Sequence, residues 1–210
     1  MRWLFDIDNP IMRYIVKAFD CMCLSVLWLL FSLPVITAGA SAAALYTTVY
    51  RYIRKGEGHL FRTFWGAFRE NWKRSTLVWL VVLVIGALLA TDVLVFRTLA
   101  IQGEMMGKLY WPVLLLCCVA ATWVAFLNAY AARFQGSVRD VLRISFLLMT
   151  AHPIKSFTVF VPIAAGILLT AMVPSLLIIS PAAVCLVNSL VLEQIFAIHL
   201  AAEEETEKSL

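Results

Sequence analysis

A run of thirty residues without a charged side chain, Cys21 to Tyr50, limits what this chain can fold into. A hydrocarbon core about 30 Å thick is crossed by roughly 20 apolar residues in helix, so this run can enter a bilayer and is longer than one upright span requires. Pro34 lies near its middle, where it removes a backbone donor and pushes against the carbonyl of Leu30. The run therefore predicts a transmembrane helix that is kinked or broken at Pro34.

The residues that follow Pro34 change from bulky to small. Every residue from Ala38 to Ala44 is Ala, Gly or Ser. Small residues spaced four apart let another helix approach closely in lipid. We therefore predict that Val35 to Tyr50 is the packing centre of a helical bundle, with Gly39 at a position where two backbones meet.

Two consecutive segments carry a resemblance to a known family. They are LWLLFSLPVITAGASAAALY and RYIRKGEGHLFRTFWGAFRENWKRSTLVW, preceded by Asp8-Asn9-Pro10. Their order resembles the YesL-like family of bacterial integral membrane proteins, a domain family whose function is not established. The resemblance is strongest over residues 6–80. It implies a multi-pass protein of the bacterial cell membrane, commonly encoded near carbohydrate-uptake genes, and it supplies no catalytic or ligand-binding residue.

The composition excludes an ordinary soluble domain. Of 210 residues, 62% are hydrophobic and only 14% are charged, whereas a soluble domain carries about 25% charged residues. Apolar stretches recur along the chain, and no polar block is long enough to form a second core. We predict an all-α, polytopic transmembrane bundle of about five spans. Residues 1–202 form its single integral membrane domain, and residues 203–210 form an acidic cytoplasmic tail that is too polar to fold alone.

The placement of Lys and Arg predicts the topology. Residues 51–74 contain seven of them and residues 133–155 contain four, against two in residues 97–108. By the positive-inside rule the first two segments are cytoplasmic and the third is external. The predicted spans are Cys21–Tyr50, Ser75–Phe96, Leu109–Ala132 and two segments within Ser156–Ala202.

This arrangement places the amino terminus outside and the carboxyl terminus inside. An alternative bends the first segment at Pro34 into a re-entrant hairpin and keeps residues 1–20, with Arg2, Arg13 and Lys17, on the inside.

Two cytoplasmic segments have an amphipathic helical pattern. The first carries an aromatic stripe made of Phe61, Phe64, Trp65, Phe68 and Trp72. The second runs from Val138 to Met149 and ends at His152-Pro153. Each helix lies either on the lipid surface or on the cytoplasmic end of the bundle, since both positions would use the same stripe. Arg62, Arg69 and Lys73 face away from the aromatic stripe and form a candidate docking surface, called the basic face below.

The candidate polar site inside the membrane is Glu193, with Asn188, Gln194 and the more distant Asn128. A carboxylate in hydrocarbon is a functional candidate because charge there costs several kcal/mol. It can serve transport or sensing. Alternatively, Glu193 is protonated or is paired structurally with a basic residue, for which the sequence offers Arg51, Arg133 and Lys155.

No enzyme motif, cofactor fingerprint or metal-ligand spacing occurs in the sequence, and the five cysteines are expected to be buried thiols. Nucleic-acid binding is not expected either, because the basic residues flank spans. Two function classes remain. One is an accessory or regulatory protein of a membrane system such as carbohydrate uptake, with the bilayer and a transporter or other membrane protein as partners. The other is a small-solute transporter or an ABC permease-like subunit, for which Ala131–Gly136 offers only a faint likeness to a permease coupling loop.

Overall fold

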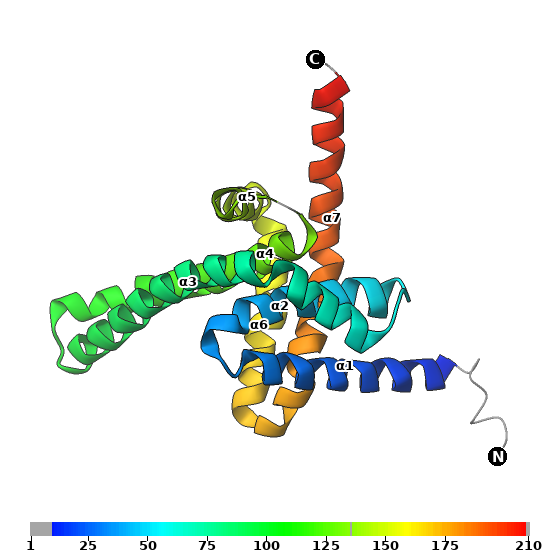
Figure 1. Cartoon of the computed structure of the whole chain (residues 1–210). Coiled ribbons are helices and arrows are strands. Elements are labelled where there is room, and N and C mark those ends of the chain that lie inside the picture. Colours follow the sequence, from blue (N-terminus) through cyan, green and yellow to red (C-terminus); the bar gives the residue numbers. More distant parts are fainter. Residues whose placement is uncertain (1–9, 135, 209–210) are drawn as a thin grey trace.

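The computed structural model describes residues 10–134 and 136–208, and every regular element in this part of the chain is helical (Figure 1). The predicted turn at Asp8-Asn9 lies outside the described residues. The α-helices are α1 (Pro10–Ser32), α2 (Ala38–Thr48), α3 (Leu60–Ile101), α4 (Tyr110–Arg133), α5 (Val138–Ala151), α6 (Pro153–Met172) and α7 (Ser180–Lys208). Short helical turns are η2 (Val35–Thr37), η3 (Val49–Arg54, a π-helix), η4 (Met105–Leu109) and η5 (Pro174–Ile178).

Five helical segments of the described chain are long and apolar enough to cross a membrane. They are Ile15–Ser32, Leu60–Ile101, Met105–Arg133, Pro153–Met172 and Ser180–Leu200. This confirms the prediction of an all-α membrane protein with about five spans. The first span differs from the predicted one, because it ends before Pro34 instead of continuing to Tyr50.

The chain reverses at Pro34. Helix α1 ends at Ser32, Pro34 has extended backbone angles, and α2 returns beside α1 (Figure 1). The Ser41 hydroxyl of α2 donates to the Trp28 carbonyl of α1 at 3.0 Å. The predicted break at Pro34 is confirmed, but the two parts form the hairpin of the alternative topology and not two halves of one span. Helix α1 ends before Pro34 because proline also biases the preceding residue, Leu33, away from the helical region. The hairpin itself follows from the packing of α2 against its neighbours.

Helix α2 is the packing centre, as predicted. Nine of its eleven residues are buried, and it contacts α1, α3, α4 and α7. A side chain at Gly39 would collide with Trp79 and would lie 3.0 Å from the carbonyl oxygen of Ser75. The Trp79 indole nitrogen donates to the Val35 carbonyl at 2.8 Å. The absent side chain at Gly39 therefore lets α3 cross α2 at close range.

The predicted surface helix at residues 61–74 and the predicted span at residues 75–96 are one continuous helix, α3, of 42 residues. The expected basic link, Lys73-Arg74-Ser75, does not interrupt it. No proline or glycine occurs there, and extending an existing helix by one residue needs no new nucleation. The second amphipathic segment does form a separate helix, α5, because His152-Pro153 ends it.

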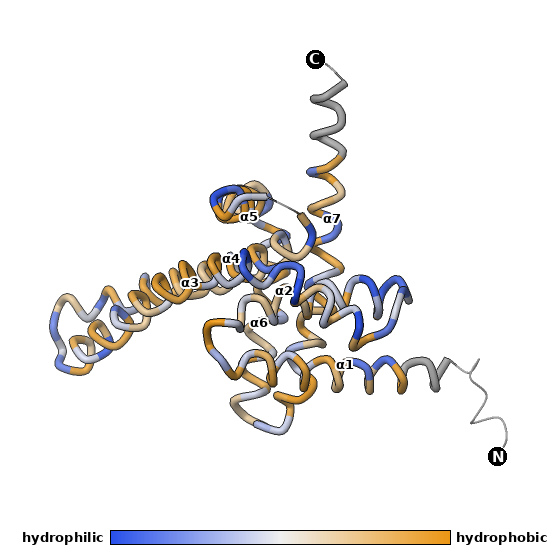
Figure 2. Tube along the Cα trace, in the orientation of Figure 1, coloured by the Kyte–Doolittle hydropathy of each residue, from blue (hydrophilic) through white to orange (hydrophobic). Residues whose placement is uncertain are grey.

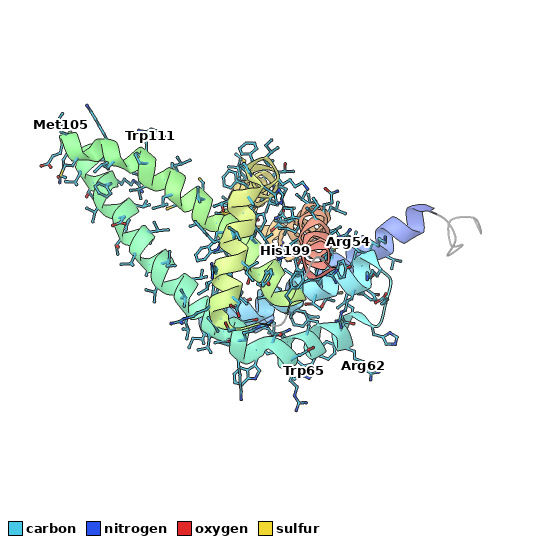
Figure 3. All side chains as sticks on the ribbon, turned by 90° about the horizontal axis from the view of Figure 1, so that it is seen from above. Arg54, Arg62, Trp65, Met105, Trp111 and His199 are labelled. Atoms are coloured by element: carbon cyan, nitrogen blue, oxygen red, sulfur yellow. The ribbon has the colours of Figure 1, made fainter. Side chains whose placement is uncertain are left out.

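The second half of α3 pairs with the first half of α4 in a two-helix arm that projects from the bundle (Figure 1). Residues 79–121, called the distal arm below, contain one buried residue, Gly107. The arm is largely apolar along its length, with polar residues at its tip (Figure 2). Met105 and Trp111 mark this tip, far from the bundle (Figure 3).

Helices α6 and α7 form another hairpin, closed by η5. Helix α7 continues through Lys208, so the predicted tail at residues 203–210 is helical over most of its length instead of frayed. The reason is again continuity, since Ala and Glu are good helix formers and the helix is already nucleated within the bundle.

Candidate functional site

Glu193 on α7 is held by two partners from other helices. Its Oε2 lies 3.2 Å from Nη2 of Arg133, the last residue of α4. Its Oε1 accepts a hydrogen bond of 3.1 Å from the hydroxyl of Tyr46 on α2. The Glu193 side chain is only 11% exposed, whereas that of Arg133 is 33% exposed. Of the basic partners suggested by the sequence, the structure therefore pairs Glu193 with Arg133.

A second aromatic ring, Tyr50, supports this ion pair from one helical turn further along. The guanidinium carbon of Arg133 lies 4.3 Å from the centroid of the Tyr50 ring. Arg54 and Lys55 approach the same ring at 5.6 Å and 4.9 Å. Tyr46 and Tyr50 are four residues apart, which places them on one side of the helix. That spacing was visible in the sequence and was the signal for two site residues that the sequence analysis missed.

An apolar cavity of about 540 Å³ lies between α2, α4, α6 and α7. Asn128 of α4 and Asn188 of α7 both line it, together with Tyr46, so the structure brings two of the four polar candidates to one space. Glu193 does not line it. Gln194 does not line it and is exposed, because it follows Glu193 by about 100° around the helix. We refer to this space as the interhelical cavity.

Two polar atoms of the residues that line the interhelical cavity have no hydrogen-bond partner in the described part of the chain. They are the amide oxygen of Asn188 and the indole nitrogen of Trp28, both buried. An unpaired buried polar group costs about 1–3 kcal/mol. The residues that line the cavity are mostly apolar, so it can hold a mostly apolar small molecule.

The basic face lies on the opposite side of α3 from the packed aromatic side chains. Phe64 is fully buried, and its ring and that of Phe68 lie 5.6 Å and 5.1 Å from the ring of Phe31 on α1. This part of the aromatic stripe therefore docks on protein. The remaining stripe residues are exposed in part, at 60% for Phe61, 44% for Trp65 and 45% for Trp72.

The side chains of the basic face, Arg62, Arg69 and Lys73, are exposed. Arg62 points away from the bundle (Figure 3). The Trp65 ring, although partly exposed, lies 5.6 Å from the ring of Phe31 on α1. The structure thus combines both positions considered for this helix: one edge packs on α1, and the other is open to the surroundings.

Comparison with known proteins finds a family to which part of this chain is similar. The model of the family described as "Protein of unknown function, DUF624" matches residues 21–93, which run from α1 through the hairpin and α2 into α3. The uncharacterized protein YesL of Bacillus subtilis (strain 168) is 26% identical over 162 residues, 73% of each chain. The chain is similar to the YesL-like family. No solved structure matches this YesL-like chain significantly.

The region matched by the family model includes Pro34, Gly39, Tyr46 and Tyr50, and it excludes Arg133 and Glu193. The best-matched part of this YesL-like protein is therefore the hairpin and its crossing with α3. Glu193 of α7 joins the later helices to that part, through its ion pair with Arg133 of α4 and the hydrogen bond that it accepts from Tyr46 of α2. Among the described residues, no group of three His, Cys, Asp or Glu side chains is placed to hold a metal ion.

Ala131–Arg133 form the last turn of α4, which Arg74 holds from α3 together with Gly136 beyond it. The guanidinium of Arg74 donates to the Ala131 carbonyl at 2.6 Å and to the Gly136 carbonyl at 3.4 Å. Gln135 lies outside the described residues. The turn is tied to its own bundle, which gives the faint likeness to a permease coupling loop no structural support.

Proposed function

We propose that this protein is an accessory or regulatory protein of the bacterial cell membrane that binds an acidic partner through the basic face of α3. The observation that carries the proposal is the fixed presentation of exposed cations. Arg62, Arg69 and Lys73 project from a helix that buried Phe64 anchors on α1. Preorganised charges lose little entropy on binding, and complementary charge speeds encounter with a partner.

The pairing of Glu193 supports this proposal over a transport mechanism centred on that carboxylate. Its charge is balanced by Arg133 and its second oxygen is engaged by Tyr46. A paired carboxylate is a structural element in the simplest interpretation. The common genomic context of YesL-like proteins makes a carbohydrate transporter the first partner to test.

The experiment is affinity purification from native membranes after mild solubilisation. We expect a carbohydrate transporter subunit to co-purify with the unmodified protein and to be lost with Arg62→Gln combined with Arg69→Gln. The matched control is Arg97→Gln with Lys108→Gln, which removes two exposed cations from the arm. Equal recovery with both double variants, with the protein inserted normally, would refute the docking proposal.

A second candidate is a small-solute carrier, and the interhelical cavity is the observation that favours it. Its volume of about 540 Å³ lies in the usual range for small-molecule sites, about 300–1,000 Å³. Solute flux by the purified protein in liposomes tests this candidate. Flux that is abolished by Asn188→Leu would establish it, and an absence of flux in sealed liposomes would leave the accessory role.

A further inference from the structure

Three arginines from three different elements line a second, smaller pocket. Arg51 belongs to η3, Arg74 to α3 and Arg133 to the end of α4. The pocket has a volume of about 80 Å³. One water requires about 10–15 Å³ of such space, so the pocket is large enough for a group several times that size. We call it the arginine pocket.

Hydrogen bonds orient Arg74 and leave one of its donors unused. Its Nη2 donates to the Ala131 carbonyl at 2.6 Å and to Oδ1 of Asn71 at 3.2 Å. Its Nε is buried and has no hydrogen-bond partner among the described residues. A buried guanidinium N–H without an acceptor is costly, because hydrogen bonds to charged groups are the stronger ones. The hydrogen bonds hold Arg74 as an oriented cation in the wall of the arginine pocket.

The charge balance in and around the arginine pocket is positive. Glu70 is the acidic residue among those that line it. Glu193 balances part of the charge of Arg133 from the adjoining interhelical side, at 3.2 Å. Arg54 and Lys55 add positive charge nearby, because both lie against the Tyr50 ring on which Arg133 also stacks.

We propose that the arginine pocket binds a phosphate group, carried either by an anionic lipid headgroup or by a free phosphate compound. The planar guanidinium fork matches the oxygens of phosphate in a bidentate geometry, and three arginine residues line this pocket. The pocket also lies on the side that the positive-inside rule makes cytoplasmic, where basic pockets between helices bind phosphate headgroups. The proposal goes beyond partner docking and uses none of the basic-face residues.

The test measures thermal unfolding of the full chain in a neutral detergent. The probes are inorganic phosphate, with potassium chloride at equal ionic strength as reference, and phosphatidylglycerol, with phosphatidylcholine as reference. We expect one or both probes to raise the unfolding temperature above its reference. Stabilisation by phosphatidylglycerol alone assigns the site to a lipid headgroup, and stabilisation by inorganic phosphate assigns it to a free phosphate compound.

Two variants with opposite expected effects keep the result specific. Arg51→Gln should weaken binding about tenfold, because a charged hydrogen bond contributes roughly that factor. Glu70→Gln should tighten binding, because it removes a repelling carboxylate. The matched controls are Arg62→Gln and Glu57→Gln, both exposed and outside the pocket. The proposal is overturned if neither probe stabilises the protein, or if each pocket variant responds like its control.

Discussion

The two halves of α3 have the same secondary structure and opposite surroundings. The first half, through Val78, buries Phe64, Ala67 and Ser75 against the bundle. The second half, in the distal arm, has no buried residue. Lipid tails are as apolar as leucine, so the second half needs no protein cover to be stable in a membrane. Apolar character therefore identifies a span but does not identify which residues form the core.

The largest expected effect is all-or-none labelling of single cysteines, which reports the side of the membrane that each segment faces. The hairpin brings η3 back beside the first half of α1. There, burial and the carboxylate of Asp20 on α1 raise the pKa of Tyr52 on η3. We therefore expect single cysteines at Phe5, ahead of the first span, and at Glu57 to be protected from an impermeant maleimide in intact cells, and one at Lys108, at the tip of the arm, to be labelled.

A cysteine at Glu205 serves as the reference for the carboxyl-terminal side. The five native cysteines lie in apolar segments and provide the background signal. Labelling at position 5 together with protection at position 205 would restore the topology with the amino terminus outside and would contradict the hairpin.

The next effect compares two apolar side chains on the same helix. Phe64→Ala should lower the free energy of unfolding by about 3–5 kcal/mol, since it leaves a cavity in a packed site. Leu88→Ala on the distal arm should change it little, because Leu88 is 62% exposed. Equilibrium unfolding in mixed micelles measures both. Similar losses for the two variants would show that the arm is covered by protein.

A third comparison uses two glycines. Gly39→Leu forces a side chain into Trp79 and the Ser75 backbone, so we expect a loss of at least about 1–3 kcal/mol. Gly86→Leu is the matched control, because no atom lies within 4 Å of a side-chain carbon added there. Thermal unfolding in detergent reports the difference. An unchanged unfolding temperature for Gly39→Leu would remove α2 from the packing centre.

The smallest effect concerns the start of α5. Asp140 donates its backbone N–H to the Ser137 hydroxyl, and hydrogen bonds from the hydroxyl and the backbone N–H of Ser137 hold the pKa of Asp140 below its usual value. The carboxylate therefore contributes stability above about pH 4, the unfolded value, and this contribution is lost as the pH falls through the folded pKa.

Asp140→Asn should consequently make stability less dependent on pH below about pH 4 while leaving the slope at neutral pH unchanged. Urea unfolding at several acidic pH values measures it. An identical pH profile in the variant and the unmodified protein would contradict a role for this cap.

The sequence predicted the elements better than their connections. Pro34 and Pro153 each interrupt a helix, and both interruptions could be located because proline acts locally. That Pro34 reverses the chain could not, since the direction after a break depends on what the next helix packs against. The continuity of α3 was missed because a change from charged to apolar composition was taken as a helix boundary, although no residue there breaks a helix.

The site was predictable in part for a similar reason. Glu193, Asn188 and Asn128 could be selected because polar groups in apolar segments are conspicuous. Choosing Arg133 among three basic partners required knowing where α4 ends relative to α7. The arginine pocket was not predictable at all, because its three arginine residues lie far apart in the sequence and line one pocket only through the crossing of α3 with α2 and α4.

The continuity of α3 has a mechanical consequence. A helix of 42 residues is about 63 Å long, at about 1.5 Å per residue, which is roughly twice the thickness of the hydrocarbon core. Near its midpoint it crosses α2 where Trp79 passes Gly39. Buried Phe64 fixes the end that carries Arg62 on α1. A displacement of the arm's tip near Met105 would therefore bear on the bundle at this crossing, without any change in secondary structure.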